Sequence, residues 1–582
     1  MFIDCESPEL ARRVLYRLAM KTLAVLSLGV LWTAAGCTDS GDGSDASDLD
    51  SQAPVADVSG TQPAQASSPD ASQASSSDDQ VSTFNGDAAK TFEDVTARHC
   101  DNHNRMANNV PVHDATGVFT SVSSQGYIDL DNEFFQDLGS NGRRCVSCHV
   151  PTTGWSITPK QLQETFEETD GGAYDDGLGL AAVFRTNDGS NSPKADVSTK
   201  AKRRQAYSML LTKGLVRVGL PIPATAEFEL VAVDDPYKFA SAAELSLFRR
   251  PLPTANLKFD STVMWDGREV VPGSAVLPEL QTQASDATTG HAKGAPLSQA
   301  QRASIAQFET ELASAQIWDN QAGDLRAAGA EGGPEAILAQ PFYVGINDNF
   351  GDSQTHAAFS PVVFNLFDSW TNIGQNDHDC DARHDHGRGY DYGYGYGHDN
   401  HGRCRCRDSK HGNGYRNDRR DDARRAIARG QEIFNNHKIA ITGVSGINDE
   451  AAFGKPATLM GTCSSCHNTP NGGNHSVVAP LDIGLTDASR RTADMPLYTL
   501  RNKITGETVK VTDPGRALID GKWSHIGRFK GPMLRNLAPR APYFHNGFAK
   551  DLWAVVDFYN TRFSIGLTKQ EKSDLVAFLG SL

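Results

Sequence analysis

The pattern Cys-x-x-Cys-His occurs twice in this chain of 582 residues, at positions 145–149 and again at 463–467. Within a helical turn, residues three positions apart lie on the same side, so both thiols of one motif can reach one ligand. A redox disulfide or half of a zinc site uses the two cysteines but has no need of the histidine behind them. With only 10 cysteines and 17 histidines in the chain, chance does not explain two copies. Both copies therefore indicate the same chemical task.

Covalent attachment of a c-type haem is the task that fits this motif. The two thiols bond to the vinyl groups of one porphyrin, and the histidine lies below the ring as an iron ligand. We therefore predict two covalently bound c-type haems, with His149 and His467 as iron ligands. The attaching residues would be Cys145, Cys148, Cys463 and Cys466. A zinc site built from both cysteine pairs is the alternative, but it gives the two histidines no role.

The N-terminal segment has the layout of a secretory signal. Three arginines precede an apolar run at 23–32, which is too short to span a membrane as a helix and leads into small residues and Cys37. Residues 34–37, Ala-Ala-Gly-Cys, resemble a bacterial lipoprotein box, so we expect 1–37 to be a lipoprotein-type signal peptide. An ordinary signal peptide is the alternative. A lipid on Cys37 would anchor the exported protein to a membrane surface, in the periplasm or at the outer membrane.

Two stretches have compositions that do not support a packed core. Residues 38–91 are rich in Ser, Asp and Ala, and we expect them to form a disordered tether. Residues 377–422 contain no Val, Ile, Leu, Met, Phe or Trp and combine many Gly, Tyr and His residues with three cysteines. This low-complexity insertion is either a solvated segment or a metal-binding one, and no zinc-type ligand spacing favours the second. The two stretches delimit the expected haem domains, at 92–376 and 423–582.

Helical patterns surround the second motif and continue to the C-terminus. Residues 423–436 and 552–559 each place apolar side chains on one face of a helix. Thr568 and Glu571 form a capping box that would begin a last helix. Gly, Pro and Asn interrupt much of the remaining sequence. We therefore predict a mainly α protein of two cytochrome c-like haem domains, with long loops, few strands and the low-complexity insertion.

Three further segments resemble one known family. They are "NGRRCVSCH" with the following "GWS", "VMWDGRE", and the C-terminal "LRN", "APYFHNG" and "VVDFY". They resemble the bacterial diheme cytochrome c peroxidases and the related diheme enzyme that matures tryptophan tryptophylquinone. The resemblance implies that His149 holds a reactive haem and His467 an electron-transfer haem, with Trp265 between them as an electron relay. A buried aromatic residue at a domain interface is the plainer interpretation of Trp265, and both can hold.

The same resemblance assigns residues near the second haem. His545 would pack beside it, with its ring N–H fixed by a neighbour. The family's far axial ligand, Met in the peroxidases and Tyr in the quinone-maturing enzyme, corresponds to Tyr559. Met533 and Met495 are rival ligands, and a core tyrosine with a hydrogen-bonded hydroxyl is a further alternative. A thioether ligand raises the iron potential, whereas a phenolate lowers it.

The chain also departs from the family pattern. Gln283 stands where the family has a glutamine, but Lys293 occupies the place of the acid that assists O–O cleavage. His291 is the nearest candidate general base, with a surface histidine as the alternative. Arg250 and Arg540 occupy the side-chain positions of the family's calcium site. Two guanidinium groups would repel the ion, so we expect no calcium there.

These features favour a diheme c-type oxidoreductase that reduces hydrogen peroxide at the His149 haem. Electrons would come from a small redox protein or a quinol-linked donor through the His467 haem. A dioxygen-using diheme oxygenase and a non-enzymatic two-haem electron carrier are the alternatives, because the free face of the iron decides between catalysis and electron transfer. The net charge of −16 argues against nucleic acid as a partner. The sequence leaves open the donor, the oligomeric state, the role of the insertion and that of Cys100.

Overall fold

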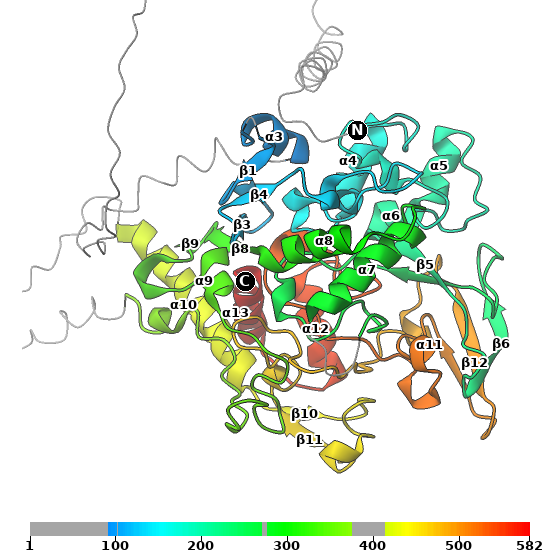
Figure 1. The fold of residues 1–582 in the computed structure, drawn as a ribbon. Helices are drawn as coiled ribbons and strands as arrows, with labels where there is room; N and C mark the ends of the chain where they lie inside the picture. The colour runs from blue at the N-terminus through cyan, green and yellow to red at the C-terminus, as the bar shows by residue number, and fades with distance from the viewer. Residues whose placement is uncertain (1–90, 102, 271–275, 375–413) are drawn as a thin grey trace, which may run out of the picture. The chain divides into compact units, whose positions relative to one another are not determined.

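Strands contribute more to this fold than the sequence suggested, so the expectation of a mainly α protein is wrong. The computed structural model describes residues 91–101, 103–270, 276–374 and 414–582 (Figure 1). Of these residues, 33% lie in helices and 16% in strands, which form several small sheets. Most of the strands are short, and the pairs β3–β8 and β6–β12 join segments distant in sequence, so local periodicity gives little sign of them. The expected signal peptide, the tether up to residue 90 and residues 377–413 of the insertion lie outside the described residues.

The helices and strands alternate irregularly along the chain. The helices are α3 (Phe92–Arg98), α4 (Pro159–Glu168), α5 (Lys200–Ala206), α6 (Ser208–Lys213), α7 (Val276–Gly290), α8 (Gln299–Glu311), α9 (Pro334–Ala339), α10 (Gly414–Asn436), α11 (Ala517–Asp520), α12 (Leu552–Arg562) and α13 (Lys569–Gly580). The strands are β1 (Arg105–Ala107), β2 (Val112–His113), β3 (Gly117–Ser123), β4 (Tyr127–Asp129), β5 (Val216–Leu220), β6 (Phe228–Asp234), β7 (Leu245–Arg249), β8 (Leu312–Asp319), β9 (Gly323–Asp324), β10 (Ile439–Ile441), β11 (Leu459–Gly461), β12 (Leu497–Asn502) and β13 (Thr508–Val511).

Two of the sheets bring together distant parts of the chain. The four-stranded sheet has the order β2-β3-β8-β9, and all seven residues of its strand β3 are buried. The three-stranded sheet has the order β13-β12-β6, with β12 antiparallel to β6. Strand β6 belongs to the expected first haem domain and β12 to the second, so backbone hydrogen bonds join the two halves of the chain.

The C-terminal helices pack around the region of the second motif. Helices α10 and α13 lie side by side (Figure 1). A Cβ atom at Gly430 would lie 2.0 Å from the carbonyl oxygen of Asp574, so this close approach requires glycine. The capping box at the start of α13 is confirmed, because Thr568 Oγ1 accepts from the Glu571 N–H and the Glu571 carboxylate accepts from the Thr568 N–H. Helix α10 includes residues 414–422, which the sequence analysis had assigned to the insertion.

Within the described parts of the chain, none of the helices combines the length and the apolar character that crossing a membrane requires.

Candidate functional site

The two Cys-x-x-Cys-His motifs adopt the same local structure. In each motif the first cysteine begins a single 3-10 turn and the second cysteine directly follows it. The turns are Cys145–Ser147 in the first motif and Cys463–Ser465 in the second. The N–H of the motif histidine donates to the carbonyl of the first cysteine, at 3.0 Å and 3.1 Å respectively. The hydroxyl of the serine that ends each turn accepts a hydrogen bond from the backbone N–H of the residue just before the turn. The distances are 3.1 Å from Arg144 to Ser147 and 3.0 Å from Thr462 to Ser465. The sequence repeat is therefore a structural repeat.

Both motif histidines are oriented in the same way. The Nδ1 atom of His149 lies 3.3 Å from the carbonyl oxygen of Trp155, and that of His467 lies 2.5 Å from the carbonyl oxygen of Gly473. Burial lowers the pKa of each ring to about 4, so both imidazoles are neutral. A neutral ring whose Nδ1–H donates to a carbonyl leaves Nε2 free as a metal ligand.

The protein core holds these rings in place. Trp155 is fully buried and donates its indole N–H to Ser121 on β3, at 2.8 Å, which fixes the carbonyl that accepts from His149. Phe134 lies against His149 with ring centroids 6.3 Å apart, and Phe434 lies against His467 at 6.1 Å. Each histidine is thus supported by one backbone carbonyl and one aromatic ring.

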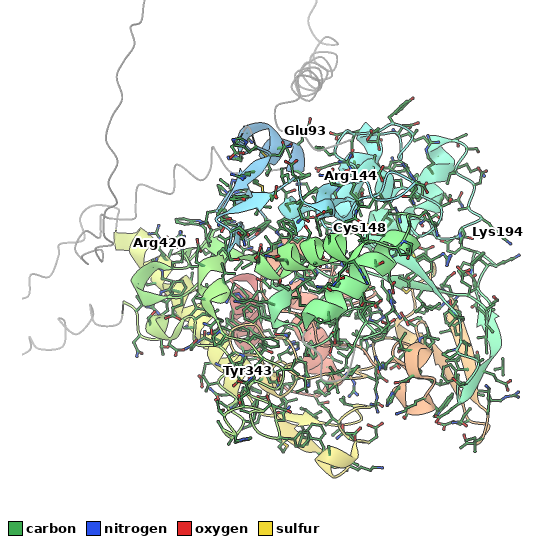
Figure 2. The ribbon with its side chains drawn as sticks, viewed as in Figure 1. Glu93, Arg144, Cys148, Lys194, Tyr343 and Arg420 are labelled. Carbon is green, nitrogen blue, oxygen red and sulfur yellow. The ribbon has the colours of Figure 1, made fainter. Side chains whose placement is uncertain are left out.

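Each motif lines its own cavity. The first-motif cavity is lined by Cys145, Cys148 and His149 together with residues of α7 and α8. Cys148, labelled in Figure 2, lies in the same cavity wall as Ile305 and Glu309 of α8. The second-motif cavity has a mostly apolar wall, to which α10, α12 and α13 all contribute. Its wall also includes the motif residues Cys463, Cys466 and His467.

The chemistry of these residues fits a covalently attached haem. All four motif cysteines are free, and burial raises their pKa, to about 12 for Cys463 and Cys466. Protonated thiols in an apolar cavity suit thioether bonds better than zinc coordination, which needs thiolates. Within the described residues, no group of three or more His, Cys, Asp or Glu side chains could hold a metal ion. The two cysteine pairs also line different cavities, which disfavours the zinc alternative.

A thin wall separates the two cavities, and Trp265 is part of it. Six residues line both cavities: Arg250, Pro251, Leu252, Pro253, Trp265 and Lys530. The indole N–H of Trp265 donates to the carbonyl of Arg250 at 2.8 Å, and its own carbonyl accepts from the Lys530 N–H at 2.9 Å. Trp265 is therefore in contact with both cavities, and its place between two haems stays a prediction.

The second-motif cavity contains His545 and two of the candidate ligands. Tyr559 and Met533 both line it. Met495 lines neither cavity and packs instead with Met209, Leu215 and Phe248. Burial, then the nearby Cys466 and Cys463, raises the pKa of Tyr559, and its hydroxyl has no hydrogen-bond partner among the described residues.

His545 is held by ring contacts rather than by the hydrogen bond that the sequence analysis expected. It stacks on Phe529 with centroids 4.1 Å apart and meets Trp265 edge to face at 6.1 Å. It is 1% exposed, and among the described residues neither ring nitrogen has a hydrogen-bond partner. A buried polar atom without a partner costs free energy, so these nitrogens suit a polar group of a bound cofactor.

The first-motif cavity brings together the candidate catalytic residues. Gln283 and His291 both line it, Gln283 from α7 and His291 just after that helix, whereas Lys293 is not part of its wall. The sequence analysis missed Asp188, Arg143 and Glu309, which line the same cavity. Glu309 is 3% exposed, and burial raises its pKa to about 8. Spacing gave no signal for these residues, because they come from segments far apart in the chain.

Buried arginines occupy the interface between the two halves of the chain. The Arg250 guanidinium donates to the carbonyls of Lys213, Ile157 and Arg540, at 2.6 Å, 2.7 Å and 3.0 Å. Arg540 in turn donates to the carbonyls of Asn536, Met533 and Arg535. The positive charge at this place is thus supplied by the chain itself.

Besides Arg143, the sequence analysis missed a second buried arginine, Arg249. Arg249 of β7 binds the Asp513 carboxylate with two hydrogen bonds, at 2.7 Å and 2.9 Å, and contacts Asp266 at 2.5 Å. Asp266 follows Trp265 directly in the sequence, so this network fixes the backbone beside the wall tryptophan. The only sequence signal was the short motif that contains Trp265.

Part of the chain is similar to curated cytochrome-c peroxidases. It is 33% identical over 135 residues to the cytochrome-c peroxidase IdrP2 of Denitromonas iodatirespirans, which covers 22% of this chain and 37% of the relative. It is 31% identical over 140 residues to the cytochrome-c peroxidase IdrP1 of Pseudomonas sp. (strain SCT), which covers 21% of this chain and 36% of the relative. The chain thus matches little more than a third of the length of these relatives. No protein-family model matches it.

Proposed function

We propose that this protein carries two covalently attached haems and reduces hydrogen peroxide in the first-motif cavity. The observation that carries the proposal is the pair of matching Cys-x-x-Cys-His turns, each facing its own cavity, with Trp265 in the wall between them. The similarity to proteins named cytochrome-c peroxidase supports the same reaction class. The name of each relative describes the activity of the whole protein, whereas the similarity extends over little more than a third of its length.

The residues of the first-motif cavity have separate roles in this proposal. A bound haem would supply an iron that binds peroxide and accepts electrons, with His149 as its protein ligand. Reduction of one peroxide takes two electrons and two protons, breaks the O–O bond and gives two water molecules. Heterolysis requires a proton to move from one peroxide oxygen to the other, and His291 is the base available for that transfer. Gln283 lines the same cavity and can orient peroxide through its amide.

Electrons would enter through the second-motif cavity. The donor would be a reduced small redox protein or a quinol-linked donor, and the transfer would run from the second haem through Trp265 to the first. Tyr559 and Met533 are the candidates for the second axial position of that haem, since both line the cavity. A closed second iron with an open first iron is the arrangement that separates electron transfer from catalysis.

We also propose that the protein is exported and held at a membrane surface by a lipid on Cys37. The support is the sequence pattern at 1–37. Labelling cells with radioactive palmitate would test it, because the Cys37→Ala protein should lose the label. Incorporation of label into that variant would contradict the anchor.

One set of measurements tests the proposed activity. The protein, made in a host that attaches c-type haem, should gain the mass of two haems and give a pyridine haemochrome with two haems per chain. Electron paramagnetic resonance should show one high-spin and one low-spin ferric haem in some redox state, and peroxide should oxidise a reduced cytochrome c. Two low-spin haems in every redox state, with no peroxide consumption, would instead establish an electron carrier. Dioxygen uptake without peroxide consumption would indicate an oxygenase.

A further inference from the structure

Three side chains from distant segments meet beside the first-motif cavity. The Asp188 carboxylate accepts from the Arg143 guanidinium through one oxygen and contacts His291 Nδ1 through the other. All three residues line the cavity. Asp188 is 6% exposed and Arg143 3%, whereas the His291 side chain is 40% exposed. The carboxylate is therefore enclosed between two donors, and the imidazole is its more accessible partner.

Arg143 is itself fixed on two sides. Its Nε donates to the carbonyl of Ala182 at 2.9 Å, and its Nη2 donates to that of Val183 at 2.8 Å. The remaining terminal nitrogen is the one that donates to Asp188. A planar guanidinium with three directed bonds has little freedom to rotate. Arg143 therefore sets the orientation of the Asp188 carboxylate.

The backbone of His291 is held by the same two segments. Its carbonyl accepts from the Asn141 side-chain amide at 2.8 Å and from that of Asn187 at 3.2 Å. Asn141 lies two positions before Arg143, and Asn187 directly precedes Asp188. The segments that orient the imidazole thus also orient its main chain. A histidine on an unconstrained surface turn would lack these contacts.

We propose that Asp188 is a positioning residue that keeps the proton of His291 on Nδ1 and leaves Nε2 as the base facing the first-motif cavity. Arg143 holds Asp188 in that orientation. The proposal rests on the proposed function only for the reaction that the base serves. A carboxylate that accepts from one ring nitrogen fixes the tautomer and stabilises the imidazolium that forms when the other nitrogen takes a proton.

The surrounding charges agree with a base that starts neutral. Partial loss of hydration by the imidazole, part of which still reaches solvent, and then the positive charges of Arg143, Arg268 and Lys293 lower the pKa of His291. A neutral ring can accept a proton from peroxide, and Asp188 is the anionic group in contact with it within the part of the chain that the structure describes. With haem bound, Nε2 would take the proton of one peroxide oxygen and return it to the other, which would leave as water when the O–O bond breaks. The remaining oxygen would become a second water with two electrons from the reduced donor protein and two protons from solvent.

A plainer interpretation is that Arg143 and Asp188 form a structural ion pair that His291 merely covers. Both interpretations predict some loss of stability when Asp188 is changed, so activity of a single variant does not separate them. They differ in whether the effect of changing Asp188 depends on His291. Residues that act as a unit give non-additive effects, whereas independent ones add.

The test compares Asp188→Asn, His291→Gln and the double variant in the two-haem protein. In Asp188→Asn an amide NH2 group replaces one of the two carboxylate oxygens, so the side chain no longer accepts on both the Arg143 side and the His291 side, and the tautomer is no longer fixed. We expect kcat for peroxide to fall at least about tenfold in Asp188→Asn with KM nearly unchanged, and further in His291→Gln. The double variant should match His291→Gln within about twofold. The association rate of cyanide with the ferric protein should follow the same order, because hydrogen cyanide must also give its proton to a base.

Asp176→Asn is the matched control. Asp176 is a buried aspartate of the same region, but it accepts only from the backbone N–H groups of Leu178, Gly179 and Ala181. This variant should lose stability and keep the wild-type cyanide rate. If Asp188→Asn fails to fold, Arg143→Lys replaces it, since lysine keeps the charge and loses the bonds to Ala182 and Val183. Its loss of rate should again vanish in the His291→Gln background.

The outcomes separate the inference from the proposed function. Equal losses from Asp188→Asn in the wild-type and His291→Gln backgrounds would overturn the inference and leave the peroxidase standing. So would a wild-type cyanide rate in Asp188→Asn. If the wild-type protein consumes no peroxide, yet cyanide association slows in Asp188→Asn and no further in the double variant, the positioning role holds and the peroxidase proposal fails.

Discussion

The two cavities are alike on the side of the motif histidine and differ on the other side. Both have the same 3-10 turn, a histidine Nδ1 on a backbone carbonyl, and a phenylalanine against the ring. The first-motif cavity then adds Gln283, His291, Asp188 and Glu309. The second-motif cavity instead adds Tyr559 and Met533 in a mostly apolar wall. One binding unit used twice thus leads to different chemistry through what the fold places opposite it.

Removing one pair of cysteines at a time should break the comparison most completely. If the proposed function holds, Cys145→Ala with Cys148→Ala should abolish peroxide reduction, since the proposed haem nearest His291 would no longer be attached, while the other haem would keep its spectrum. Cys463→Ala with Cys466→Ala is the matched variant and should retain peroxide binding but lose reduction by an external donor. Haem content, stopped-flow peroxide binding and steady-state turnover measure the three effects. Identical behaviour of the two double variants would refute the division of roles.

Glu309 makes the stability of the first-motif region depend on pH. Its pKa in the folded protein is about 8, above the ordinary value of 4.5, so the folded state binds this proton more tightly than the unfolded state. The stability gained from that proton is therefore present below the unfolded pKa and is lost as pH rises toward 8. Glu309→Gln should reduce this pH-dependent decrease in the free energy of unfolding. The difference should be a few kcal/mol at most, since one pKa unit is about 1.4 kcal/mol.

Urea unfolding at several pH values checks this expectation. Glu279→Gln is a suitable control, because Glu279 is also buried but does not line the first-motif cavity. An unchanged pH dependence in Glu309→Gln would mean that Glu309 does not carry the effect.

Trp265→Leu should sharpen the comparison by uncoupling the two cavities. Electron flow between the haems should slow by about tenfold or more, equivalent to at least about 1.4 kcal/mol of barrier. Peroxide binding and the spectra of both haems should change little. Flash reduction of the second haem, followed by the spectrum of the first, measures the rate directly. The rate in Trp265→Phe, which keeps an aromatic ring, should lie between the wild-type rate and that of Trp265→Leu. A wild-type rate in Trp265→Leu would exclude the relay.

Tyr559→Phe should alter only the second haem. If the phenolate ligates that iron, its loss should raise the reduction potential and change the paramagnetic resonance signal. Met533→Leu is the paired variant, and the ligand is the residue whose change alters the spectrum. A signal unaffected by Tyr559→Phe would assign Tyr559 to the cavity wall alone.

Chelation should produce the smallest effect. The Arg250 guanidinium already binds three backbone carbonyls between the two halves of the chain, so no divalent cation is needed there. Peroxide turnover should therefore be the same before and after dialysis against EDTA and after calcium is restored. A loss of turnover that calcium reverses would show that a cation site exists elsewhere.

Local sequence patterns predicted the parts of this protein that depend on neighbouring residues. The two matching Cys-x-x-Cys-His turns, the capping box of Thr568 and Glu571 and the helix around Tyr559 all follow from spacing within one turn or one helix. Trp265 was singled out through the family resemblance, and its role as an electron relay stays a prediction.

Long-range partners were beyond such patterns. Arg143, Asp188 and His291 lie in three separate segments, and Arg249 pairs with Asp513 far along the chain. Strand β12 has a local partner in β13, but β6 pairs with β12 in the other half of the chain, so the sequence around β6 does not signal this sheet. The mainly α prediction was wrong for the same reason, because a strand is stabilised by a partner that its own sequence does not specify.

The pairing of β6 with β12 has a consequence for how the molecule is made. Edge hydrogen bonds of β6 stay unsatisfied until residues 497–502 have been synthesised, so the first half of the chain cannot complete its fold by itself. Expressing 92–376 and 423–582 as separate pieces would yield two fragments with exposed strands rather than two working halves.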